Sequence, residues 1–339
     1  MTTINEYIEP LLKDRDLSFD QASNLLDIVF EGQVPEAQIA AFLTAMRVKG
    51  LTSPEVAGLA KSLRSHAVKV DHGVENPVDV VGTGGAAVKT FNVSTASALV
   101  AAGAGVYVAK HGNRAITSKC GSADVLEELG VNIAPGPEVV AECIRQARVG
   151  FMFAPMYHPA MKYVQPIRKS LGFRTVFNIL GPLANPADVP AIVLGVAEEE
   201  LMHILAEALD MLGTRFALVV HCDGLDEIST SAVTKMLELK DGQITQKELN
   251  PEDFGIGISS VDDLKVTDAK TSAKIVRDIL EGKQSGAARD MIVLNASAAI
   301  IAGGLAEDFN SALGLANESI DGGGALTCLE KMIEVSNKA

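Results

Sequence analysis

The sequence has 339 residues. A single hydrophobic core seldom stabilises a chain of this length, so we expect two domains. A formal net charge of −14 at pH 7 disfavours nucleic acid and anionic membranes as partners. No apolar stretch reaches membrane-spanning length, and the polar, acidic N-terminus differs from a signal peptide, so we expect a cytoplasmic protein. The four cysteines lie far apart without a CxxC pair, which argues against a zinc site or a disulfide framework.

The first seventy residues predict helices only. Apolar residues recur with a helical period of 3.6 at 25–29 and again at 39–46. Gly50 is the expected end of the second of these helices, and Ser53 is the expected N-cap of the next.

Beyond residue 71, short valine-rich runs alternate with helical ones. We expect strands at 78–81, 106–109, 150–153, 191–196 and 216–220, and representative helices at 137–147 and 199–212. Alternation of this kind predicts an α/β fold with a mostly parallel central sheet covered by helices. The segment 161–186 breaks the alternation, because it contains two helical pieces with no strand between them.

The strand at 78–81 runs into a glycine turn, Gly82-Thr83-Gly84-Gly85, which leads toward a helix near Asn92. Glycines let the backbone approach an anion closely, and the N-terminus of a helix offers N–H donors and a positive dipole end. Ser94 and Thr95 are the expected caps of that helix. Taken alone, such a turn is more often only a tight turn, and it matches neither common nucleotide-binding glycine motif.

A second polar loop follows the next expected strand. The run Lys110-His111-Gly112-Asn113-Arg114 begins where the strand at 106–109 ends, and Ser118, Gly121 and Ser122 continue the loop to a helix at 123–129. Ligands of open α/β sheets bind outside the carboxyl ends of the strands, so the two loops are expected to face one cleft. The alternative is a solvated basic turn.

A pair of acidic residues, Asp226-Glu227, follows the expected strand at 216–220 and a turn at Asp223-Gly224. Mg²⁺ prefers oxygen ligands and is bound through one or two carboxylates beside substrate phosphates. Read alone, the pair is typical of a solvated surface loop. Its place after a strand and a turn weakens that interpretation and leaves a metal site open.

The order and spacing of these motifs resemble those of the anthranilate phosphoribosyltransferases. The resemblance rests on 82–85, 92–95, 110–114, 121–126, 174–186 and 223–227, and it spans the chain. It implies a helical domain of residues 1–70 with 161–186, and a larger α/β domain of residues 71–160 with 187–339. It also implies a homodimer formed through the N-terminal helices, with the substrates between the two domains.

The resemblance further implies a reaction and its residues. The family transfers ribose 5-phosphate from phosphoribosyl pyrophosphate (PRPP) to the amine of anthranilate, releases pyrophosphate, and serves tryptophan biosynthesis. The implied PRPP-binding residues are Gly82, Gly84, Gly85, Thr90, Asn92, Val93, Ser94, Thr95, Lys110, His111, Gly112, Asn113, Arg114, Ser118 and Ser122. The implied anthranilate-binding residues are Gly82, His111, Asn113, His158, Arg168, Gly181 and Pro182. Ser94, Asp226 and Glu227 would hold magnesium, with two ions expected per subunit.

No general base is assigned, and His111 is the one candidate. Positioning of the substrates and stabilisation of the leaving group can supply most of the acceleration. One departure from the family pattern is Ala86, where many members carry an aspartate that would lie near the metals.

Two alternatives remain at this stage. A pyrimidine nucleoside phosphorylase shares the helical-plus-α/β layout, but the 110–114 run and the segment 177–186 argue against it. A non-catalytic relative that binds nucleic acid is disfavoured by the acidity of the chain.

Overall fold

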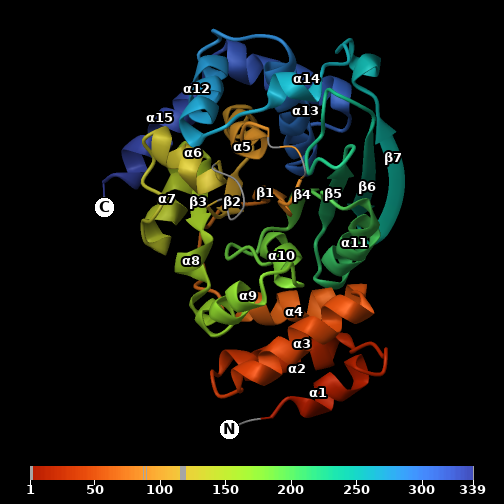
Figure 1. Ribbon diagram of the computed structural model, residues 1–339. Helices are drawn as coiled ribbons and strands as arrows, with labels where there is room; N and C mark the ends of the chain where they lie inside the picture. Colours follow the sequence, from red (N-terminus) through yellow and green to blue (C-terminus); the bar gives the residue numbers. More distant parts are fainter. Residues whose placement is uncertain (1–2, 87, 89, 115–119, 339) are drawn as a thin grey trace.

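Four helices form the N-terminal end of the molecule in this computed structural model, which describes residues 3–86, 88, 90–114 and 120–338. They are α1 (Asn5–Leu11), α2 (Phe19–Phe30), α3 (Glu36–Lys49) and α4 (Ser53–Ser65), drawn in red and orange in Figure 1. Gly50 ends α3 as expected. The N-cap of α4 is Thr52, however, and not Ser53 as predicted. The Thr52 N–H donates to a Glu55 carboxylate oxygen at 3.0 Å. This bond satisfies a backbone donor at the start of the helix and places the cap one residue before Ser53.

The rest of the chain forms one seven-stranded sheet in the order β3-β2-β1-β4-β5-β6-β7. Strands β1 to β5 run parallel, and β6 and β7 are antiparallel, so the expected mostly parallel α/β sheet is confirmed. The strands are β1 (Val78–Gly82), β2 (Val108–Gly112), β3 (Val149–Phe153), β4 (Ala191–Gly195), β5 (Phe216–His221), β6 (Thr234–Lys240) and β7 (Gln243–Leu249).

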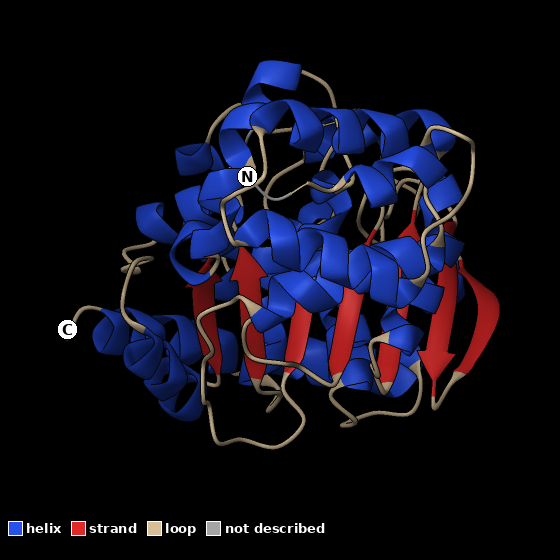
Figure 2. Ribbon diagram, turned by 90° about the horizontal axis from the view of Figure 1, so that it is seen from below, coloured by secondary structure: helices blue, strands red, loops and turns tan. Residues whose placement is uncertain are grey.

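Helices cover both faces of this sheet (Figure 2). Val193 of β4 belongs to the apolar cluster that contains α5 (Val93–Gly103) and α13 (Ala287–Ala302). Its neighbours Ile192 and Leu194 belong to a second cluster, with α4 and α11 (Met202–Met211). Because side chains alternate along a strand and both faces are buried, the central strands are almost continuously apolar, as their sequences indicated.

Strand β2 differs from the prediction in a way that matters for the site. It runs from Val108 to Gly112 and pairs in parallel with β3 along its whole length, so the first three residues of the 110–114 run belong to the strand. Lys110 and His111 therefore point to opposite faces of the sheet.

The β6–β7 hairpin was not predicted, although its turn carries a sequence signal. Asp241 and Gly242 both have positive φ, 49° and 80°, as a type I′ turn requires, and alternating residues flank them. The hairpin adds the two antiparallel strands at one edge of the sheet.

The segment 161–186 is helical, as expected, and lies between the N-terminal helices and the sheet (Figure 1). Helix α9 (Gln165–Leu171) contacts α3, and α10 (Phe177–Leu180) contacts α4. Val164, Ile167 and Phe177 belong to the same apolar cluster as the first four helices, and that cluster continues onto one face of the sheet. The division of the chain into two domains at the stated residues stays a prediction.

The other helices connect and cover these elements. They are α6 (Ser122–Glu128), α7 (Pro137–Ala147), α8 (Ala154–Tyr157), η1 (Pro159–Tyr163), η2 (Gly181–Leu183), η3 (Glu199–Leu201), η4 (Pro251–Phe254), η5 (Val261–Leu264), α12 (Ala269–Leu280), α14 (Phe309–Asp321) and α15 (Gly324–Ser336). Within the described residues, no helix is both long and apolar enough to cross a membrane.

Candidate active site

The site begins where the chain reverses direction across the sheet. Strands β1 and β4 are neighbours at the centre of the sheet, while β2 and β3 lie on one side of them and β5 on the other. The last residues in register are Gly82 of β1 and Gly195 of β4. Such a switch point, at the carboxyl ends of parallel strands, is where open α/β sheets bind ligands.

Asp226 fills the space above these two glycines. A Cβ atom on Gly82 would lie 2.3 Å from Asp226 Oδ2, and one on Gly195 would lie 1.7 Å from the Asp226 carbonyl oxygen. The Gly84 N–H donates to Asp226 Oδ2 at 2.8 Å, so the carboxylate also holds the glycine loop. The acidic pair predicted after the β5 strand is therefore brought to the predicted phosphate loop.

Helix α5 starts at this loop, but its cap differs from the prediction. Asn92, and not Ser94 or Thr95, is the N-cap, and its side-chain oxygen accepts from the Thr95 N–H at 3.0 Å. Ser94 therefore lies in the first turn of the helix. Its N–H donates to the Glu227 carboxylate, and its Oγ lies 3.4 Å from Lys110 Nζ.

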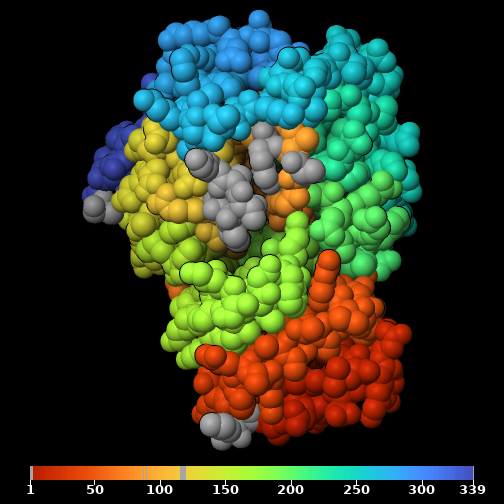
Figure 3. All heavy atoms as spheres, viewed as in Figure 1, coloured from red at the N-terminus to blue at the C-terminus, as the bar shows by residue number. Residues whose placement is uncertain are grey.

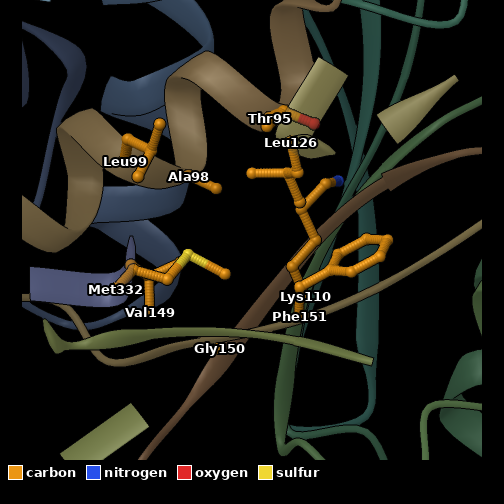
Figure 4. A pocket seen from close by; sticks show the side chains of 9 residues that line it. All are labelled: Thr95, Ala98, Leu99, Lys110, Leu126, Val149, Gly150, Phe151 and Met332. Atoms are coloured by element: carbon orange, nitrogen blue, oxygen red, sulfur yellow. The ribbon is translucent and has the colours of Figure 1, made fainter. Parts of the chain in front are cut away.

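Lys110 reaches this group from β2 and is 2% exposed. Its aliphatic stem passes Leu126 and Phe151 beside a cavity of about 10 Å³, and its nitrogen points away from that cavity (Figure 4). The ammonium donates to the Val80 carbonyl oxygen. Burial lowers the pKa of Lys110, and the neighbouring Asp79 and Glu227 oppose that shift.

Glu227 is half-buried beside a second carboxylate. Burial and the charge of Asp226 raise the pKa of Glu227 to about 8, against the opposing influence of Lys110. Two adjacent carboxylates and a serine hydroxyl are hard oxygen ligands, which fit Mg²⁺ with its remaining positions on water or phosphate. Within the described residues, no group of three or more His, Cys, Asp or Glu is placed to hold a metal ion. Water or phosphate would therefore have to supply the other ligands.

On the opposite face of β2, His111 meets a second group of predicted residues. Its Nδ1 lies 3.1 Å from the carbonyl oxygen of Gly181, which begins η2 together with Pro182. The ring of His158 packs 5.0 Å from the His111 ring. Burial lowers the pKa of His111 to about 3 and that of His158 to about 4, so both rings are neutral at pH 7.

Arg168 approaches from α9. Its guanidinium lies 5.5 Å from the ring centre of Phe177 at the start of α10, the helix that leads to Gly181. On this side the surface is hollowed between the yellow-green segment around α9 and the α/β domain (Figure 3). Burial lowers the pKa of Arg168, although the group stays protonated at neutral pH.

Arg114 points elsewhere. Its guanidinium donates to both carboxylate oxygens of Glu127, at 2.6 and 2.8 Å, and to Asp124 on α6. The Asn113 side-chain oxygen accepts from the Arg114 N–H at 2.7 Å. Binding of a phosphate by Arg114 would therefore require it to exchange partners.

The remaining predicted residues lie around these groups. Gly85 has a φ of 88°, Thr90 forms a β-bridge with Lys265, Val93 is the first residue of α5, and Gly112 faces Ser122 across the start of α6. Ser118 lies outside the described residues.

Two known family models match consecutive parts of the chain. Residues 5–67 match the glycosyl transferase family, helical bundle domain, and residues 74–326 match the glycosyl transferase family, a/b domain. The anthranilate phosphoribosyltransferase of Herpetosiphon aurantiacus is 47% identical over 338 residues, which cover 98% of this chain and 99% of that protein. This chain belongs to the anthranilate phosphoribosyltransferase family.

Solved structures of the anthranilate phosphoribosyltransferase family agree. The enzyme from Thermus thermophilus has a TM-score of 0.91 and 37% identity, over 97% of this chain and 98% of that chain. The Saccharomyces cerevisiae enzyme in complex with PRPP and Mg has a TM-score of 0.90 and 29% identity, over 99% and 98%. Membership confirms the resemblance and the pentosyltransferase class, and these comparisons give no support to either alternative.

Two buried residues beneath the site were missed from the sequence. Asp79 of β1 accepts from the His111 N–H at 3.2 Å and from the Asn185 side-chain amide at 2.7 Å. The same amide donates to the Ala109 carbonyl oxygen at 2.8 Å. A lone aspartate in the apolar strand 78–82 was the available signal, because a buried charge needs partners.

Replacement of Asp79 by alanine is expected to destabilise the protein strongly. It would leave the His111 N–H, the Asn185 amide and the Lys110 charge without this acceptor and counter-ion, at a cost of about 3–5 kcal/mol. Urea denaturation at pH 8 measures the loss. Asp79→Asn keeps an acceptor oxygen and should lose less, and an alanine variant within about 1 kcal/mol of the wild type would contradict the assignment.

His158 should make stability depend on pH. Its pKa is 6.5 when unfolded, and burial, with the nearby charge of Lys69, lowers it to about 4 in the folded protein. As pH falls below 6.5 the unfolded state gains a proton that the folded state refuses until about pH 4. The wild type should therefore lose roughly 3 kcal/mol relative to His158→Gln between pH 7 and pH 4. A difference between the two proteins that does not change with pH would show that this histidine is not buried in neutral form.

Proposed function

We propose that this chain transfers the 5-phosphoribosyl group of PRPP to the amine of anthranilate, releasing pyrophosphate, in tryptophan biosynthesis. One observation carries the proposal: Asp226, the Gly84 N–H, Ser94 and Lys110 converge at the switch point of the sheet. Relatives that are anthranilate phosphoribosyltransferases support it, as do yeast structures in complex with PRPP and Mg or with 4-fluoroanthranilate.

The phosphate half of the site uses the chain's own donors. The glycine loop 82–85 and the first turn of α5 offer backbone N–H groups and the positive end of a helix to the diphosphate. Lys110 adds a positive charge that is shielded from bulk solvent, and such shielding strengthens its attraction for an anion.

Magnesium belongs to the same half. Asp226, Glu227 and Ser94 would hold it, and two ions per subunit are the expected number. When bound, magnesium stabilises the negative charge that develops on the leaving pyrophosphate. The Asp226 carboxylate would then release the Gly84 N–H, which becomes available to a phosphate oxygen.

The anthranilate half lies on the other face of β2. Arg168 would pair with the carboxylate of anthranilate, since a guanidinium suits planar bidentate recognition. His111, His158, Gly181 and Pro182 would line the ring, with Gly82 and Asn113 beside the amine. The amine of anthranilate is already neutral before it attacks. Burial lowers the pKa of His111 to about 3, which makes its ring a weak base, and we assign no general base.

A homodimer through the N-terminal helices completes the proposal. Helices α1 and α3 line a groove of about 670 Å³. Its apolar residues include Leu12 and Val48, which are 65% and 83% exposed. An exposed apolar groove of this kind marks an interaction surface.

We place residues 1–70 and 161–186 in one domain and the protein in the cytoplasm.

An assay of anthranilate fluorescence tests the proposed function. Purified protein, magnesium and PRPP are mixed with anthranilate, and each component is omitted in turn while released pyrophosphate is measured. Loss of fluorescence that requires both PRPP and magnesium is expected. No loss with the folded protein would contradict the proposal, and phosphorolysis of nucleosides would be measured next.

Arg168→Ala separates the two halves of the site. Removal of a ground-state contact to the anthranilate carboxylate should raise the KM for anthranilate by about tenfold or more and leave the KM for PRPP nearly unchanged. Steady-state kinetics with each substrate varied in turn measure both values. A larger effect on PRPP would move Arg168 to the phosphate half.

A further inference from the structure

The side chain of Arg174 contacts the glycine loop at Gly85, although Arg174 is not one of the predicted site residues. It follows α9 and precedes α10, so it belongs to the helical segment 161–186. A Cβ atom on Gly85 would lie 1.8 Å from Arg174 Nη1, so the guanidinium rests directly on the backbone of that glycine. Gly85 has a φ of 88°, a conformation that favours glycine, so no side chain stands in the place of the guanidinium.

The guanidinium is weakly held. Its charged partner within the described residues is Glu198, at 3.5 Å, just beyond the end of β4. The side chains of Arg174 and Glu198 are 35% and 44% exposed, and a pair so open to water contributes little to stability.

The other described cations of the site have closer or more numerous partners. Lys110 is buried and donates to the Val80 carbonyl, and Arg114 is paired with two carboxylates of α6. Arg168 lies against Phe177 on the anthranilate side. Among these four described cations, Arg174 is therefore the one that a ligand in the glycine loop can draw from its present partner most easily.

We propose that Arg174 is a further binding residue for the diphosphate of PRPP, held by Glu198 until the ligand arrives. The inference rests on the proposed function, because it names a contact within the same site. A diphosphate presents several oxygens, and a guanidinium binds two of them at once. The diphosphate would therefore displace the single, half-exposed carboxylate of Glu198 from Arg174. Since Arg174 belongs to the helical segment, this contact also ties that segment to the phosphate loop.

Calorimetric titration of inorganic pyrophosphate, with magnesium in excess, tests the proposal without turnover. Arg174→Gln should bind pyrophosphate about tenfold more weakly than the wild type, as expected for a lost charge-assisted contact. The KM for PRPP should rise with it, while the KM for anthranilate stays within about twofold. Arg174→Lys keeps the charge without the fork and should lie between the two.

Two further variants sharpen the result. Glu198→Gln removes the competing carboxylate and should tighten pyrophosphate binding. Lys169→Gln removes an exposed cation from the same segment and should bind pyrophosphate like the wild type.

Three results would overturn the proposal. Wild-type affinity for pyrophosphate in Arg174→Gln would show that the arginine does not touch the diphosphate. A rise in the KM for anthranilate instead would assign Arg174 to the other substrate. A wild-type protein that binds no magnesium pyrophosphate would contradict the proposed function itself, and this inference with it.

Discussion

The packing of Asp226 against the paired ends of β1 and β4 is the constraint on which the rest of the site depends. Gly82 and Gly195 face each other at the end of the register, and a side chain on either would occupy the place of Asp226. With Asp226 seated there, its carboxylate holds Gly84, and Glu227 meets the first turn of α5. The phosphate loop, the helix terminus and the carboxylates are thus assembled by close contact at a single point of the sheet.

The pleat of β2 explains how one short run of sequence reaches both halves of the proposed site. Lys110 and His111 are consecutive, but alternation along the strand directs the first to Ser94 and the second to Gly181. Burying both polar groups is costly unless they find partners. Asp79, bonded to the His111 backbone and to Asn185, provides an anion beneath them and keeps the strand end in place.

Much of this arrangement could be predicted from the sequence, because local patterns determine it. The N-terminal helices, the parallel strands and the glycine loop follow from periodicity and glycine placement. The extension of β2 to Gly112 could not be seen, since pairing with β3 decides it and the polar residues Lys110 and His111 suggest a loop. The choice of Asn92 as N-cap and the fit of Asp226 above Gly195 likewise depend on tertiary contacts. The Asp241-Gly242 turn, by contrast, is a local signal from which the β6–β7 hairpin could have been predicted.

Binding of magnesium PRPP to a Gly195→Ala variant tests the central claim most directly. The added methyl group would displace Asp226, and overpacking of this size should weaken binding about tenfold or more in calorimetric titration, while thermal unfolding shows a folded protein. Gly314→Ala is the matched control, because its Cβ meets nothing within 4 Å. Wild-type affinity in a folded Gly195→Ala variant would contradict the account that the glycine pair positions Asp226 for the ligand.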